Sequence, residues 1–190
     1  GDSYTFGVSA FNMRSAPTAR TEGLGFSARG TWAPIDTGTT TLHLGGSYSH
    51  ENLNKGTPNL SAVSHYAGRR GPSQTMATTT AGTGGNDSQD VDAYYVQGSF
   101  MLNGGLKAYK GATGVFGSPK VGESGLWELT ARYDVMENKD VNDMKTTSAL
   151  IGLNYYINPN MRVMLNYTKG KNDKTGDEPG QIALRTQFAF

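Results

Sequence analysis

Apolar and polar residues alternate along most of this chain. Eight segments place apolar side chains at every second position and polar side chains between them: residues 4–13, 23–33, 40–50, 92–102, 125–135, 147–157, 161–169 and 181–190. A period of two is typical of a strand with one apolar and one polar face. No stretch of useful length has the period of an amphipathic helix, so the pattern predicts an all-β chain.

The connections between these segments alternate in character toward the C-terminal end of the sequence. Residues 136–145 and 169–180 are long and charged, whereas Asn158, Pro159 and Asn160 have the composition of a tight turn. An up-and-down antiparallel barrel, with long loops on one side and short turns on the other, predicts this alternation. The connection at 103–124 breaks the rule, because it is long although it falls on the turn side.

Residues 51–91 interrupt the regular spacing of the segments. They contain a Thr/Gly/Ser-rich low-complexity stretch at 75–90 and one weak strand candidate at 59–66. We predict either a long external loop here or the place where strands are missing. The rest of the range 1–190 is expected to form a transmembrane β-barrel.

Segment length and composition both favour a membrane barrel. A tilted strand of about ten residues crosses a bilayer. Only 36% of the residues are apolar, 26 are Gly, and charged residues make up 17%, below the roughly 25% of soluble domains. Aromatic residues gather near segment ends, where the interfacial belts of barrels lie; they are Tyr4, Trp32, Tyr48, Trp127, Tyr155, Tyr167 and Phe190.

Several classes of function are disfavoured by the same totals. The net charge of +1 argues against a globally basic nucleic-acid binder. The chain has no cysteine, so disulfides and thiolate metal sites are excluded. No nucleophile, base and orienting group recur together, and we therefore expect no enzyme activity, no metal and no cofactor.

Charged residues inside the segments give the most specific signal. An arginine that faces lipid at mid-membrane destabilises a barrel by about 2 to 4 kcal/mol. Four arginines lie inside the segments, and all of them are at polar positions of the alternation: Arg29, Arg132, Arg162 and Arg185. One interpretation is that they line a water-filled pore and favour anions, with Glu128 and His43 on the same face. The other is that they only pair with Glu128, Asp134 or nearby backbone.

Three further residues are weaker candidates. His43 has no second histidine at ligand spacing, so a plain polar wall residue is a better interpretation than a metal ligand. Arg69 and Arg70 form an external anion site if their loop folds inward, and otherwise remain a solvated pair.

Six stretches resemble, in the same order, the closing strands of the phosphate-selective porins of the O and P type, outer-membrane proteins of Gram-negative bacteria. They are GTWAPI, LHLGGSYSH, AYYVQGSFML, LWELTARYDV, ALIGLNYYINPNMRVMLNY and IALRTQFAF. The hairpin GLNYYINPNMRVMLNY and the terminal strand are the most specific of them.

This resemblance implies an outer-membrane channel for small anions, phosphate among them. It implies a sixteen-stranded barrel that assembles as a homotrimer in lipid, with this chain as its C-terminal half. Phosphate selectivity itself is not carried over, because the lysine-bearing constriction loop of the family lies outside the matching stretches. Phe190, together with Phe188, resembles the signal read by the barrel-assembly machinery.

The leading hypothesis is passive diffusion of small anions through an arginine-lined pore. The alternative is a small closed barrel of eight strands, a structural or adhesive surface protein whose narrow interior fills with side chains. A soluble β-sandwich is a third possibility. Small residues on the polar parity, such as Gly7, Gly45, Ser47 and Ser99, favour the first hypothesis because they are too small to plug a lumen.

Overall fold

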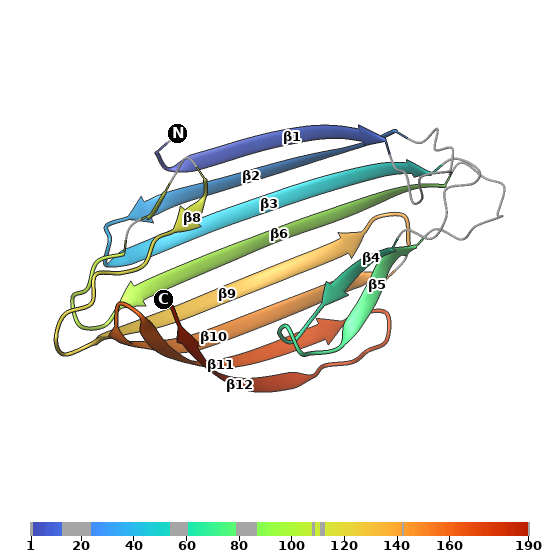
Figure 1. Cartoon of the computed structure of the whole chain (residues 1–190). Coiled ribbons are helices and arrows are strands. Elements are labelled where there is room, and N and C mark those ends of the chain that lie inside the picture. The colour runs from blue at the N-terminus through green and yellow to red at the C-terminus, as the bar shows by residue number, and fades with distance from the viewer. Residues whose placement is uncertain are drawn as a thin grey trace.

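One antiparallel sheet of eight long strands forms most of the chain (Figure 1). The computed structural model describes residues 2–12, 24–53, 61–78, 87–107, 109–110, 113–141 and 143–189. The sheet has the order β1-β2-β3-β6-β9-β10-β11-β12. Its strands are β1 (Tyr4–Asn12), β2 (Leu24–Asp36), β3 (Thr40–Leu53), β6 (Asp87–Met101), β9 (Leu126–Asn138), β10 (Lys145–Asn158), β11 (Met161–Asn172) and β12 (Gly180–Phe188).

Each predicted segment overlaps one of these strands, which confirms the predicted all-β, antiparallel architecture. Neighbouring strands pair antiparallel throughout the sheet. Within the described part of the chain, no helix is long and apolar enough to cross a membrane.

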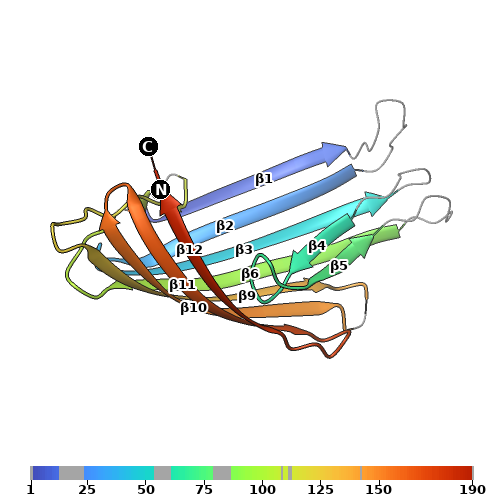
Figure 2. The same cartoon turned by 60° about the horizontal axis from the view of Figure 1, so that its bottom comes forward.

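The sheet curves into an open trough, as the two views in Figure 1 and Figure 2 show. β1 and β12 stand at the two ends of the strand order, and they do not pair with each other. A small closed barrel of eight strands would require that pairing, so the described strands do not form one.

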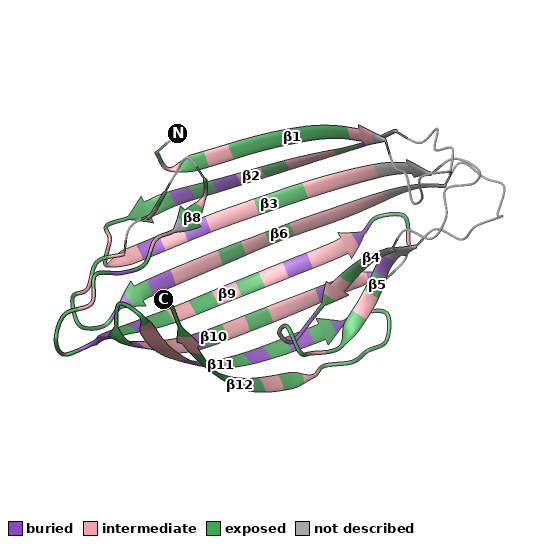
Figure 3. Cartoon of the chain, in the orientation of Figure 1, coloured by how far each residue is buried: buried purple, intermediate pink, exposed green. Residues whose placement is uncertain are grey.

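The convex side of the trough carries the apolar parity, and its large side chains are exposed. Exposed and less exposed residues alternate along the long strands (Figure 3). The exposed apolar side chains include Phe6, Trp32, Val96, Leu129, Ile151, Leu165 and Leu184. Among the described residues, no second layer covers this side, in contrast to a β-sandwich.

Two small hairpins lie on the concave side of the trough, near opposite ends of the sheet (Figure 1). One consists of β4 (Ser61–His65) and β5 (Ser73–Thr78), and the other of β7 (Tyr109–Lys110) and β8 (Val115–Phe116). The β4–β5 hairpin belongs to the connection between β3 and β6. β7 and β8 belong to the connection from β6 to β9, which the sequence marks as anomalously long.

A small buried cluster holds the β6–β9 connection against the sheet. Met101, Leu126 and Tyr156 form this cluster, and Val121 of the connection packs against it. The nearby β10–β11 turn is tight, as predicted, and the Asn160 backbone N–H donates to the Asn158 side chain at 2.9 Å. We call this end of the sheet the turn end, and the opposite end the loop end.

Candidate functional site

The register of the sheet places the four arginines of the polar parity on the concave side. Arg29 stands opposite Ser47, and that row continues through Ala93 and Met136 to Thr146. Thr146 hydrogen-bonds Ser64 of the β4–β5 hairpin, which lies inside the trough. The other three arginines lie in rows on the same side of the sheet. Arg132 stands opposite Gln97 and Leu150. Arg162 stands opposite Tyr156 and Gln187, and Arg185 stands opposite Met164.

Arg132 is held in one orientation by its neighbours. Its Nε donates to Asp134 Oδ1 at 2.7 Å, and Nη2 donates to the same oxygen. Nη1 donates to Gln97 Oε1 at 3.1 Å, and the guanidinium lies 4.2 Å from the centre of the Tyr95 ring. Asp134 therefore offsets the charge of Arg132. This agrees with the interpretation that the arginines pair with nearby acids.

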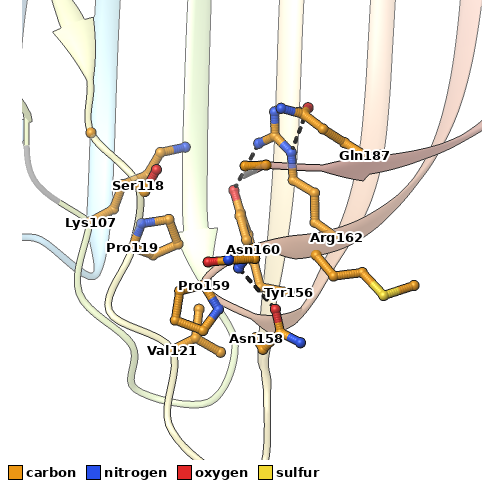
Figure 4. A pocket seen from close by; sticks show the side chains of 13 residues that line it. Lys107, Ser118, Pro119, Val121, Tyr156, Asn158, Pro159, Asn160, Arg162 and Gln187 are labelled. Carbon is orange, nitrogen blue, oxygen red and sulfur yellow. Dashed lines mark hydrogen bonds between the residues drawn. The ribbon is translucent and has the colours of Figure 1, made fainter.

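Among the described residues, Arg162 has only neutral partners, in contrast to Arg132. Its Nε and Nη2 donate to Gln187 Oε1 at 3.1 and 2.7 Å, and Nη1 lies 3.5 Å from the Tyr156 hydroxyl. The guanidinium borders a cavity of about 240 Å³ at the turn end, together with Lys107, Ser118 and Asn160 (Figure 4). Arg162 thus keeps its positive charge beside a hollow that water can fill.

Arg29 and Arg185 are exposed on the concave side. Within the residues that the structure describes, neither forms a hydrogen bond or an ion pair. Together with Arg162, they are cations that no described acid offsets.

Glu128 lies on the same face but is completely buried. Its carboxylate accepts hydrogen bonds from Lys107 Nζ at 2.5 Å, Tyr156 OH at 2.7 Å and Asn154 Nδ2 at 3.0 Å. From the sequence, Glu128 was a possible partner for one of the arginines. In the structure it is paired with Lys107 of the β6–β9 connection. Sequence reasoning missed Lys107, because nothing in its local pattern shows that the connection folds back over the sheet.

His43 also lies on the concave face and is 3% exposed. Its ring lies 5.5 Å from the ring of Tyr95 on β6 and 5.5 Å from the ring of Tyr109 on β7. The β6–β9 connection therefore covers it. The described residues contain no group of three or more His, Asp or Glu side chains that could hold a metal ion.

Arg69 and Arg70 lie in the turn of the β4–β5 hairpin, and both are exposed. The hairpin folds into the trough, which is the condition under which the sequence allows them an anion-binding role. It lies within residues 51–91, whose interpretation as an external loop or a place of missing strands stays a prediction. Phe188 is the last residue of β12 and is exposed, while Phe190 lies outside the described residues.

Comparison with known proteins gives an independent view of this architecture. Residues 70–190 match the family described as phosphate-selective porin O and P. Porin O of Pseudomonas aeruginosa is 31% identical over 125 residues, a match that covers 55% of this chain and 28% of that relative. The chain thus spans less than a third of the length of this curated relative. The matched range holds the second half of the β4–β5 hairpin and every long strand from β6 onward.

Proposed function

Because this chain belongs to the family of phosphate-selective porins O and P, we propose that it forms part of a water-filled β-barrel in the outer membrane of a Gram-negative bacterium. Small anions, phosphate among them, diffuse passively through this barrel. The observation that carries the proposal is the placement of four arginines on the concave, polar face, opposite a convex face of exposed apolar side chains.

The convex face supports a position in lipid. Its large apolar side chains are exposed, and the long strands have 9 to 15 residues, enough to cross the hydrocarbon core at a tilt. In water, an exposed apolar surface of this extent would drive aggregation. In a bilayer it is the surface that contacts the lipid chains.

The open edges of the sheet require partners in such a setting. Among the described strands, β1 and β12 each pair on one side only, and an unpaired backbone group in hydrocarbon costs several kcal/mol. Further strands therefore complete the barrel, and we propose the sixteen-stranded, homotrimeric assembly that the family resemblance implies. The barrel-assembly machinery inserts it, with Phe188 and Phe190 as the proposed signal.

The charge on the concave face supports selectivity for anions. Glu128 is paired with Lys107 and Asp134 with Arg132. The other three arginines of this face, Arg29, Arg162 and Arg185, have no acidic partner among the described residues. Fixed positive charges along a water-filled passage lower the barrier for anions and raise it for cations.

The reversal potential across a planar bilayer tests this function. We expect the full-length protein, placed between unequal potassium chloride solutions, to pass chloride in preference to potassium. Exchanging Arg29, Arg162 and Arg185 for Gln reduces that preference. A matched control removes three exposed lysines of the loop end, Lys139, Lys171 and Lys174, and leaves the preference nearly unchanged. Cation preference, or no conductance by the full-length protein, contradicts the proposal.

A further inference from the structure

The β4–β5 hairpin is fastened to the concave face by buried polar contacts. Asn172 of β11 donates from Nδ2 to Gln74 Oε1 at 2.8 Å and to the Tyr66 hydroxyl at 3.3 Å. Asn138 of β9 donates to the Met76 carbonyl at 2.7 Å. Both asparagines are almost fully buried, so these bonds are shielded from competition with water. The hairpin has a fixed place on the sheet.

The turn of the hairpin presses closely against β11 and β12. Ala67 is fully buried, and a Cβ placed on Gly170 would lie 2.5 Å from the Ala67 nitrogen. A Cβ on Gly68 would lie 2.4 Å from Gln181 Oε1. Gly68 also has a φ of +94°, a conformation that glycine adopts without strain. This close seating sets the position of the next residue, Arg69, over the concave face.

A cavity of about 430 Å³ lies between the hairpin and the sheet. Arg69 lines it from the hairpin, and Arg132, Ser148 and Thr168 line it from the sheet. A water molecule takes about 30 Å³ in the liquid, so the cavity accommodates a small oxyanion together with several waters. Arg70 is not part of the lining.

The charges around this cavity are unequal. Asp134, the acid in its lining, accepts the hydrogen bonds of Arg132. Arg69 forms no hydrogen bond or ion pair with any described residue. One guanidinium therefore faces the cavity without an offsetting carboxylate, beside hydroxyl groups that can donate hydrogen bonds.

We propose that this cavity binds a multiply charged tetrahedral oxyanion, with Arg69 as its main cationic contact and the hydroxyls of Ser148 and Thr168 as further donors. The planar fork of a guanidinium matches two oxygens of such an anion, whereas chloride offers no such pair. This inference deepens the proposed function and depends on it. The hairpin thereby gives the passage a preference among anions, beyond the general preference that the sheet arginines provide.

Inhibition of chloride conductance by inorganic phosphate tests the site in the full-length protein. In bilayers at fixed potassium chloride, phosphate that occupies the cavity slows chloride and does so saturably. We expect Arg69→Gln to raise the phosphate concentration for half inhibition by about tenfold, as for the loss of one charge-assisted contact. Arg70→Gln removes the same charge one residue away and is expected to raise it less than twofold.

Sulfate and a small phosphate monoester, used in place of phosphate, identify which oxyanions the site accepts, and inhibition by any of them supports the assignment. Channel formation by each variant shows that it has folded and inserted. The assignment is overturned if the unmodified channel is anion-selective but shows no saturable inhibition by these anions, or if both variants behave alike. Failure of the proposed function is distinguishable, because it appears in the unmodified protein as missing conductance or cation preference.

Discussion

Lys107 and Glu128 form an ion pair of 2.5 Å that joins the β6–β9 connection to the concave face of the sheet. Glu128 is completely buried, and the lysine side chain is nearly so. Asn154 and Tyr156 both donate to the other carboxylate oxygen, Oε2. The described residues of this connection are thus held inside the trough at the turn end, although the sequence shows only that the connection is unusually long.

Glu128→Gln tests this attachment. The amide keeps the size of the side chain but removes the negative charge from the Lys107–Glu128 pair, which weakens the attachment by about 2 kcal/mol. We expect trypsin to cut the folded protein after Lys107, Lys110 or Lys120 roughly thirtyfold faster, since cleavage follows the population of the open segment. Glu123→Gln, at an exposed acid of the same segment, serves as the control and leaves the rate unchanged. Equal rates in both variants would mean that the ion pair does not hold the segment.

The seating of the β4–β5 hairpin depends on the absence of a side chain at Gly170. In Gly170→Ala the new Cβ meets the backbone nitrogen and the Cβ of Ala67 and the carbonyl carbon of Tyr66, and overpacking of this kind costs about 1 to 3 kcal/mol. We expect the turn to lift from the sheet and trypsin to cleave more rapidly after Arg69 and Arg70, as followed by mass spectrometry of the peptides.

Gly152→Ala is the matched control for this experiment. A Cβ at Gly152 meets the side chains of Asn166 and Thr130, which can rotate away. The rate of cleavage in the hairpin turn should then equal that of the unmodified protein. A hairpin that stays protected in Gly170→Ala would show that it is not seated as the structure has it.

The eight long strands were predictable because a sheet with one apolar and one polar face imposes a strict period of two. Trp127, Leu129 and Tyr133 alternate with Glu128, Thr130 and Arg132 along β9, and the pattern alone assigns their faces. The same rule placed Arg29, Arg162 and Arg185 on the polar side. The resemblance to the phosphate-selective porins then predicted the family to which the chain belongs.

The two pieces inside the trough were not predictable in the same way. Lys107 meets Glu128, and Gln74 meets Asn172, through contacts between polar groups far apart in the sequence. Such contacts produce no periodic pattern in the sequence, because a connection that faces water and one that faces a polar sheet both carry polar residues. Leu150, which breaks the alternation of β10, lines the cavity under the hairpin, and this exception is a local sign that the polar face is covered there.

Single arginines of opposite parity test the assignment of the faces through stability. Leu165→Arg points a charge into lipid and is expected to lower the free energy of unfolding by about 2 to 4 kcal/mol. Asn166→Arg points the same side chain into the water-filled trough, and we expect a change below about 1 kcal/mol. Guanidinium-induced unfolding from lipid vesicles measures both. Similar losses for the two variants would argue against a bilayer position.

The most direct test of the central claim is the reactivity of single cysteines on neighbouring residues of opposite parity. The chain has no cysteine of its own, so each substituted thiol is the sole target within it for a membrane-impermeant reagent. Leu129 and Leu165 are 39% and 47% exposed in the chain, and in the proposed barrel lipid protects cysteines placed there. With the protein in sealed vesicles, we predict rapid labelling of Thr130→Cys and Asn166→Cys and none of Leu129→Cys and Leu165→Cys. Labelling of the latter pair at the same rate would contradict a pore with water on one side of the sheet and hydrocarbon on the other.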